Sequence, residues 1–204
     1  MPSGYFRQNE FTEARMKITV LTGSPVKNGN TAALVSALLS GITGSGRNVS
    51  VDDFFLNEMN IHDCRGCFSC QRTMEAPCVI RDDMDIIYKS MAGCDLMVLA
   101  APVYWWHIPG RMKTVVDRWM ALCFEENSAV LSRKKVVFFL TYGVESPTGN
   151  RLVMDMFGDI ARWLNWDYTC FPYHAERNRK RGSLPEDVET TVRELGRSLT
   201  ERGV

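Results

Sequence analysis

Four of the chain's seven cysteines stand within the stretch CRGCFSCQRTMEAPC. They are Cys64, Cys67, Cys70 and Cys78, with the spacing Cys-x2-Cys-x2-Cys-x7-Cys. Thiolates spaced in this way on a tight loop can reach the corners of one [4Fe–4S] cubane. Four thiolates can also hold a structural zinc ion, although zinc sites usually set their two pairs of ligands well apart. The stretch predicts a thiolate site that holds a [4Fe–4S] cluster, zinc or nothing.

Other features of the cysteine stretch keep these alternatives open. The seven-residue gap before Cys78 is longer than the gap of three in ferredoxin runs, and no proline follows that residue. A thiol–disulfide pair is a further interpretation of Cys-x-x-Cys, but such pairs normally open a helix after a strand. The remaining cysteines, Cys94, Cys123 and Cys170, lie within or beside apolar stretches, and we expect them in the core.

A second stretch with chemical potential is GSPVKNGNT, from Gly23 to Thr31, which joins an expected strand to an expected helix. Backbone amides, hydroxyl groups and the positive end of a helix can together hold a phosphate dianion. Lys27 adds a positive charge. The stretch has neither the Walker pattern nor the GxGxxG fingerprint, which disfavours a nucleoside triphosphate or a Rossmann-bound nicotinamide. We expect a phosphate loop here rather than an ordinary capped turn.

A third stretch, APVYWWHIPG, places Tyr104, Trp105, Trp106 and His107 at the end of an apolar run. Loops at such a place normally face water, so exposed aromatic rings there need a partner. A flat heterocycle would provide one by stacking. The alternative is that one or two of these rings close the core or lie in a subunit interface.

A phosphate loop and an aromatic loop together describe a phosphorylated planar heterocycle, and FMN fits that description. The segment Thr141 to Gly143 follows a further apolar run and can offer hydroxyl and amide groups to a ring edge. Open parallel sheets bind ligands beyond the carboxyl ends of their strands, where the strand order reverses. We therefore expect these three loops to meet.

The elements that position these loops alternate between apolar runs and helical stripes, which is the doubly wound α/β pattern. Expected strands are residues 17–24, 49–55, 95–104, 134–143 and 166–171. Expected helices begin near residues 31, 84, 110, 152 and 186. Continuous apolar runs such as DLMVLAAPVY are typical of central parallel strands covered on both faces. The sequence thus predicts a five-stranded parallel sheet with helices on both faces.

The bulk composition narrows the class of protein. The chain has 204 residues, of which 45% are hydrophobic, and its formal net charge is zero. Zero charge argues against a nucleic-acid binder, and no run approaches the ~20 apolar residues that cross a bilayer. The N-terminus lacks the apolar core of a signal peptide, so we expect a cytoplasmic protein. We expect residues 1–15 to form an arm and residues 16–204 a single domain.

Three stretches together resemble the flavodoxin-like NADPH-dependent FMN reductases, and among them the iron–sulfur flavoproteins. They are TGSPVKNGNT, CRGCFSCQRTMEAPCVIRDDMD and AAPVYWWHIPGRMKTVVDR, which stand in the family's order between residue 18 and about residue 120. The resemblance implies a flavodoxin-like fold, FMN as cofactor, NAD(P)H as co-substrate, and a homodimer or homotetramer. Iron–sulfur flavoproteins bind a [4Fe–4S] cluster on such a cysteine run, whereas many relatives with similar cysteines are described only as FMN reductases.

The resemblance also assigns residues. The FMN phosphate would be bound by Ser24, Lys27, Asn30, Thr31 and the amide of Ala32. The isoalloxazine ring would lie against Pro102, Val103, Tyr104 and Trp105, with Thr141 and Gly143 at its other edge. The cluster, where one is present, would be held by Cys64, Cys67, Cys70 and Cys78.

These observations predict an FMN-dependent oxidoreductase. It would pass reducing equivalents from NAD(P)H through the flavin to an acceptor such as a quinone, free flavin or a redox protein. No side chain need act as a nucleophile, because the flavin carries the chemistry and the protein positions the reactants. The alternative is an electron carrier or redox sensor that exchanges electrons with a protein partner and has no substrate of its own.

Overall fold

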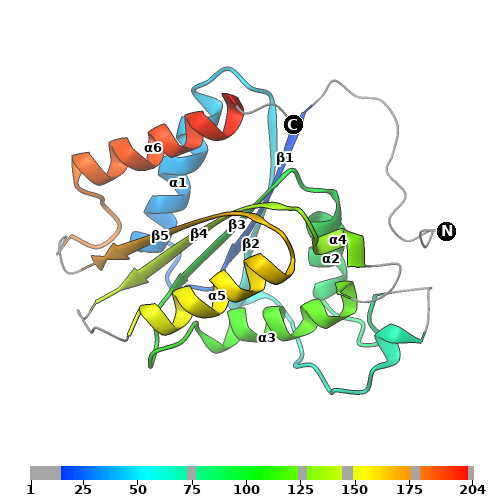
Figure 1. Cartoon of the computed structure of the whole chain (residues 1–204). Helices are drawn as coiled ribbons and strands as arrows, with labels where there is room; N and C mark the ends of the chain where they lie inside the picture. The colour runs from blue at the N-terminus through cyan, green and yellow to red at the C-terminus, as the bar shows by residue number, and fades with distance from the viewer. Residues whose placement is uncertain (1–14, 73–76, 124–127, 144–148, 176–179, 202–204) are drawn as a thin grey trace.

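The computed structural model describes residues 15–72, 77–123, 128–143, 149–175 and 180–201. Its centre is a sheet of five parallel strands in the order β2-β1-β3-β4-β5 (Figure 1). The strands are β1 (Met16–Thr22), β2 (Val49–Phe55), β3 (Leu96–Pro102), β4 (Lys135–Tyr142) and β5 (Asp167–His174). This order is that of flavodoxin-like folds, so the predicted fold class is confirmed.

Helices cover both faces of the sheet (Figure 1). On one face lie α1 (Asn30–Thr43) and α6 (Glu186–Glu201), and on the other α2 (Met84–Gly93), α3 (Gly110–Arg118) and α5 (Arg151–Trp163). Shorter described elements are α4 (Ser128–Leu131) and the 3-10 turns η2 (Leu56–Glu58), η3 (Ser69–Gln71) and η4 (Trp119–Leu122). Each helical layer therefore closes its own hydrophobic core against the sheet.

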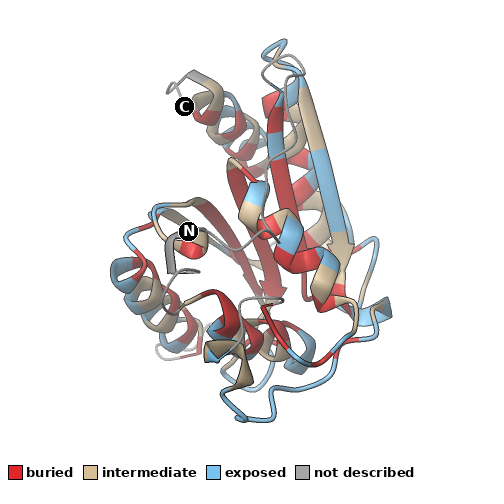
Figure 2. Ribbon diagram, turned by 90° about the vertical axis from the view of Figure 1, so that its right-hand side faces the viewer, coloured by how far each residue is buried: buried red, intermediate tan, exposed pale blue. Residues whose placement is uncertain are grey.

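Burial across the sheet follows the position of each strand. Six of the seven residues of β3 and six of the eight residues of β4 are buried. Figure 2 shows the interior of the sheet coloured as buried. Strands covered on both faces need apolar side chains at every position, which explains the continuous apolar runs. The edge strand β2 has no buried position, and its exposed Asp52 and Asp53 are charges of the kind that discourage pairing with another edge.

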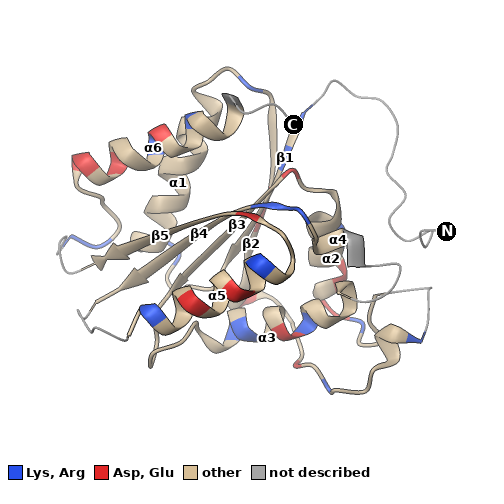
Figure 3. Cartoon of the chain, viewed as in Figure 1, with Lys and Arg blue, Asp and Glu red and all other residues tan. Residues whose placement is uncertain are grey.

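Helix α5 shows how little the surface charges contribute to the packing. Along this helix two acidic residues stand between two basic ones (Figure 3), and Arg151 lies 3.4 Å from Asp155 in an exposed ion pair. Such pairs are worth at most about 0.5 kcal/mol. The inner side carries Val153 and Phe157, both fully buried, so apolar packing holds this helix to the sheet.

Helices α1 and α6 approach each other closely through two glycines. A Cβ atom on Gly41 would lie 2.1 Å from the carbonyl oxygen of Arg193, and one on Gly196 would lie 2.3 Å from that of Leu38. A side chain at either position would push the helices apart. The two glycines therefore let α6 close over α1, the helix that begins at the expected phosphate loop.

The expected elements are present, with shifted ends. The last strand continues from Phe171 to His174 because it pairs with β4 as far as Tyr142. The helix after Pro109 tightens into η4 beyond Arg118. The N-terminal arm falls almost wholly outside the described residues, so it and the single domain stay predictions. Within the described ranges, no helix combines the length and apolar character that crossing a membrane requires.

Candidate functional site

Three loops meet at the carboxyl ends of β1, β3 and β4. The amide of Gly23 donates to the carbonyl oxygen of Ala100 at 2.8 Å, and the amide of Val103 donates to that of Thr141 at 2.7 Å. The hydroxyl groups of Thr31 and Thr141 share a buried hydrogen bond of 3.0 Å. The loop after β1, the loop after β3 and the end of β4 are thus joined by direct bonds.

This junction is the point where the strand order of the sheet reverses. The chain leaves β1 for α1 on one face, and it leaves the neighbouring β3 for α3 on the other face (Figure 1). The two connections therefore diverge to opposite faces of the sheet. Ligands of open α/β sheets bind at such a point.

The loop after β1 presents an uncapped helix N-terminus. The N-cap residue of α1, Gly29, has no side chain, and no side-chain cap is present there. The first amides of a helix lack partners within the helix, and its N-terminus carries a partial positive charge. Ser24 and Thr31, which flank the loop, are only 4% and 3% exposed. Amides and buried hydroxyl groups thus surround a place that suits an anion.

A turn near residue 182 rests on this loop. The amide of Gly182 donates to Asn30 Oδ1 at 2.9 Å. Gly182 has a left-handed φ of +80°, and a Cβ there would lie 2.4 Å from the carbonyl oxygen of Asn28. One of the predicted phosphate-binding side chains is therefore held by a distant segment. The sequence analysis missed Gly182, whose signal was a glycine at the end of a basic stretch.

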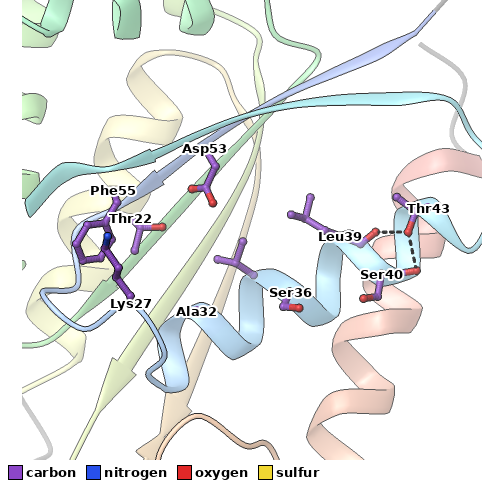
Figure 4. A pocket seen from close by; sticks show the side chains of 10 residues that line it. Thr22, Lys27, Ala32, Ser36, Leu39, Ser40, Thr43, Asp53 and Phe55 are labelled. Atoms are coloured by element: carbon purple, nitrogen blue, oxygen red, sulfur yellow. Dashed lines mark hydrogen bonds between the residues drawn. The ribbon is translucent and has the colours of Figure 1, made fainter. Parts of the chain in front are cut away.

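Lys27 reaches away from the helix N-terminus. Its ammonium lies 2.7 Å from a carboxylate oxygen of Glu58 and 5.3 Å from the centre of the Phe55 ring. It borders a groove of about 590 Å³ between β2 and α1, in which Asp53 faces the helix (Figure 4). Burial raises the pKa of Asp53. A bond from Lys27 to a phosphate would require its side chain to leave Glu58, so that role stays a prediction.

The loop after β3 forms a tight aromatic hairpin. Tyr104 and His107 exchange backbone hydrogen bonds of 2.8 and 3.0 Å. The two central residues, Trp105 and Trp106, both have positive φ, 48° and 61°, as in a type I′ turn. A left-handed backbone costs a non-glycine residue about 1–2 kcal/mol. Trp105 is nonetheless 90% exposed, so this strained turn holds a large ring in solvent. Such strain is typical of functional sites.

The other predicted ring contacts lie beside this hairpin. Pro102 ends β3 and pairs in register with Thr141, and Val103 is half-buried next to it. Gly143 is exposed, and its carbonyl oxygen lies 3.3 Å from His174 Nε2. Ala32 is half-buried in the first turn of α1. The structure brings the predicted FMN residues to one end of the sheet, and their individual roles stay predictions.

The cysteine loop leaves the sheet and is largely exposed. Cys64 and Cys67 are exposed, Cys70 is half-buried and Cys78 is buried. Gly66 and Phe68 have left-handed φ values of 62° and 54°, which curl the loop between the first thiols. Among the described residues, no group of three or more His, Cys, Asp or Glu side chains is placed to hold a metal ion. The donor set suits a thiophilic group, and the metal site stays a prediction.

The thiols differ in how readily they ionise. Hydrogen bonds from Ser69 stabilise the thiolate of Cys67 and hold its pKa below the usual value. The pKa of Cys70 is raised, first by burial and then by the negative charge of Cys78. Burial raises the pKa of Cys123 to about 11. Burial also raises the pKa values of Cys94 and Cys170, in keeping with their places in or beside the core.

Comparison with known families decides the class to which this site belongs. A family model described as NADPH-dependent FMN reductase matches residues 16–166. The chain belongs to the NADPH-dependent FMN reductase family. The matched residues run from β1 through α5 and include all three loops and the cysteine stretch.

Curated relatives add the branch of the family. An iron-sulfur flavoprotein of Methanosarcina thermophila is 36% identical over 103 residues, which are 50% of this chain and 52% of the relative. One from Clostridioides difficile (strain 630) is 25% identical over 185 residues, 90% of this chain and 78% of the relative. The likeness is therefore to the iron–sulfur flavoprotein branch. The chain spans about half the length of the archaeal relatives that it matches.

Solved structures confirm the fold independently. An NAD(P)H:quinone oxidoreductase from Methanothermobacter marburgensis superposes with a TM-score of 0.67 at 19% identity, covering 94% of this chain and 99% of that one. An NADH:FMN oxidoreductase in its apo form gives a TM-score of 0.63 at 15% identity, with 90% and 88% covered. At such identities the likeness establishes the fold alone.

Proposed function

We propose that this chain is an FMN-dependent oxidoreductase that passes reducing equivalents from NAD(P)H to an acceptor such as a quinone, free flavin or a redox protein. The observation that carries the proposal is the meeting of an uncapped helix N-terminus and a strained aromatic hairpin at one end of the sheet. A phosphate joined to a flat conjugated ring needs these two features side by side. Membership of the family supports FMN as the cofactor.

The residues present fit FMN. The buried hydroxyl groups of Ser24 and Thr31, and the amides from Asn30 to Ala32, would hold the phosphate. The ring would rest against Pro102, Val103, Tyr104 and Trp105, with Thr141 and Gly143 at its edge. The hydrogen bond between Thr31 and Thr141 links the side of the site proposed for the phosphate to the side proposed for the ring.

The bound flavin would supply the hydride and electron transfer. The chain's own task is to fix the phosphate, to shelter one part of the ring, and to admit donor and acceptor in turn. The exposed Trp105 is suited to stack on a planar molecule. No described side chain is needed as nucleophile or metal ligand for this reaction.

A second candidate function is an electron carrier or redox sensor. The observation that favours it is the four-cysteine loop together with relatives named iron-sulfur flavoproteins. In that case Cys64, Cys67, Cys70 and Cys78 would hold a [4Fe–4S] cluster that exchanges electrons with a protein partner. Measuring anaerobic NAD(P)H oxidation with small acceptors separates the two functions, because a pure electron carrier should oxidise almost no NAD(P)H under these conditions.

The experiment that tests the proposal is a visible spectrum of the anaerobic protein, with FMN titration of the apoprotein and assays of iron and acid-labile sulfide. We expect a flavin spectrum with one FMN per chain, and weaker binding in Thr31→Val. Protein that stays colourless and takes up no FMN would refute the proposal. Several iron atoms per chain, with an equal number of acid-labile sulfides, would favour the second candidate function, an electron carrier.

We also propose that the chain acts as a cytoplasmic homodimer or homotetramer of one domain over residues 16–204, with neither nucleic acid nor membrane as a partner. The zero net charge supports the absence of nucleic acid. Sedimentation equilibrium of the FMN-loaded protein measures the assembly directly. A monomer at micromolar concentration would contradict this part.

A further inference from the structure

One face of α3 lies along the segment that leads into the cysteine loop. Arg111 donates to the carbonyl oxygen of Ile61 at 3.2 Å, and Thr114 Oγ1 donates to Asp63 Oδ1 at 2.7 Å. Arg118 Nη1 donates to the carbonyl oxygen of His62 at 2.8 Å. Residues at i, i+3 and i+7 share one side of a helix, so these three form a continuous polar stripe. The stripe binds the segment 60–63, which we call the incoming stem of the cysteine loop; residues 80–83 form its outgoing stem.

The same arginine also holds the outgoing stem. Arg118 Nη2 donates to the carbonyl oxygen of Ile80 at 3.2 Å, and its two terminal nitrogens contact the Asp82 carboxylate at 2.9 and 3.3 Å. Asp82 in turn accepts the amide hydrogen of His62 at 2.9 Å. The side chains of Arg118 and Asp82 are 1% and 0% exposed. A buried, doubly hydrogen-bonded pair therefore joins both stems to α3.

The pair holds the two ends of the cysteine loop close to each other. His62 precedes Cys64 by two residues, and Ile80 follows Cys78 by two residues. Both anchored carbonyl groups bind one planar guanidinium, whose fork geometry is rigid. The first and last thiols of the run therefore leave from neighbouring points. The two ends of the loop are thus held together, although the described thiols are not gathered around one point, so a ligand that needs all four has only the middle of the loop to rearrange.

We propose that Arg118 and Asp82 are positioning residues that pre-close the four-cysteine loop for a thiolate-bound group. The proposal rests on the thiolate site of the proposed function and does not depend on the flavin. Helix α3 begins directly after the aromatic hairpin and ends at Arg118. It therefore connects the flavin end of the sheet to the cysteine loop as one rigid element.

The size of the effect follows from loop closure. The segment between the two anchored carbonyls is residues 63–79, which is 17 residues. Closure entropy grows as (3/2)RT ln n, so complete loss of the closure would weaken four-thiol binding by roughly 70-fold. Asp83 also joins the stems, through a bond of 2.7 Å from the Asn60 amide. We therefore expect a loss of about tenfold when only the buried pair is broken.

Cobalt(II) is the probe, because thiolate–cobalt absorption reports how many thiols bind. Reduced full-length protein is titrated anaerobically, and the variants are Arg118→Lys and Asp82→Asn. Tyr88→Phe is the matched control, because the Tyr88 hydroxyl contacts Arg118 and neither stem. We expect the control to lose a few degrees of thermal stability with unchanged cobalt affinity. Both test variants should bind cobalt about tenfold more weakly at similar helix content.

Three results would overturn the proposal. The first is cobalt affinity in both variants within twofold of the parent protein. The second is an equal loss in Tyr88→Phe, which would indicate general destabilisation. The third is a parent protein without four-thiolate absorption. Should Arg118→Lys fail to fold, Asp82→Asn decides alone. FMN titration of the same samples keeps failure of the flavin proposal distinguishable from failure of this one.

Discussion

The proposed flavin end of the sheet, formed by the loops after β1, β3 and β4, and the cysteine loop are held in place by different means. The three flavin-side loops follow directly from strands, and backbone bonds such as that from Gly23 to Ala100 continue the sheet into them. The cysteine loop has an exposed middle and depends at its stems on the buried pair of Arg118 and Asp82. The first site is a consequence of the fold, whereas the second depends on side-chain contacts, of which the buried pair is the one that binds both stems to α3.

The largest expected effect comes from breaking that contact. Asp82→Ala leaves the Arg118 guanidinium buried without its carboxylate, which costs about 3–5 kcal/mol. Urea unfolding monitored by circular dichroism measures the loss. Asp117→Ala, which removes the exposed partner of Lys113, is the control and should change stability by less than about 0.5 kcal/mol. Equal losses of stability in the two variants would contradict the claim that the buried pair is what holds the cysteine loop.

Acid should weaken the same pair. Burial by itself would raise the pKa of Asp82, but hydrogen bonds from Arg118 and from the His62 and Met84 amides outweigh it and hold this pKa below its usual range. A carboxyl group with a lowered folded-state pKa stabilises the protein above the unfolded value, about 3.9, and loses that contribution as pH falls further. The stability difference between the parent and Asp82→Asn should therefore be constant above pH ~5 and shrink below pH ~4. A difference that grows in acid would contradict the assignment.

The flavin end should respond to a change in the turn that rests upon it. Gly182→Ala adds left-handed strain of about 1 kcal/mol and a clash with the Asn28 carbonyl oxygen. Gly46→Ala is the matched control, because Gly46 has a φ of +79° and open space around its Cβ position. Both variants should lose stability, and only Gly182→Ala should also bind FMN more weakly, by about tenfold or 1.4 kcal/mol. Unchanged FMN affinity would show that the phosphate loop does not need this turn.

A glycine substitution in the aromatic hairpin should change protein stability and FMN affinity in opposite directions. Trp105→Gly removes the left-handed strain, so stability should rise by up to about 1 kcal/mol while FMN affinity falls. Trp105→Ala loses the same ring and keeps the strain, so it should be less stable than the glycine variant. Thermal unfolding of the apoprotein and FMN titration measure the two quantities. Tighter FMN binding in Trp105→Gly would contradict a stacking role.

Local patterns were sufficient to predict the sheet and the meeting of three loops at one of its edges. The apolar runs at residues 95–104 and 134–143 predicted β3 and β4, because strands covered on both faces must be apolar throughout. The loops beyond them are placed by the topology of a parallel sheet, so their convergence followed once the strands were known. The composition of GSPVKNGNT and APVYWWHIPG then indicated phosphate and a flat ring.

Long-range contacts explain what the sequence analysis could not supply. Asn30 and Gly182 are 152 residues apart, and Asp82 and Arg118 are 36 apart. The hydrophobic periods of strands and helices, 2 and 3.6 residues, indicate local structure and do not indicate contacts between residues so far apart. The contact of Lys27 with Glu58 is a further case, because the sequence of the loop does not indicate which neighbouring side chain a lysine contacts. The thiol spacing likewise defines a donor set without defining what it holds.

The smallest expected effect compares single thiols across the two kinds of environment. Hydrogen bonds from Ser69 lower the pKa of Cys67, whereas burial raises that of Cys123 to about 11. Because the thiolate is the nucleophile, alkylation of Cys67 should reach half its maximal rate at a lower pH than a free cysteine, near 8.5, and Cys123 at a higher pH. Mass spectrometry after brief iodoacetamide pulses, at a series of pH values that extends to the Cys123 pKa of about 11, measures each site in the metal-free protein. Ser69→Ala should move Cys67 back toward the ordinary value and leave Cys123 unchanged. If Cys67 and Cys123 titrated together, the curl between Gly66 and Ser69 would not favour the thiolate, and the exposed loop would be no more reactive than the buried core.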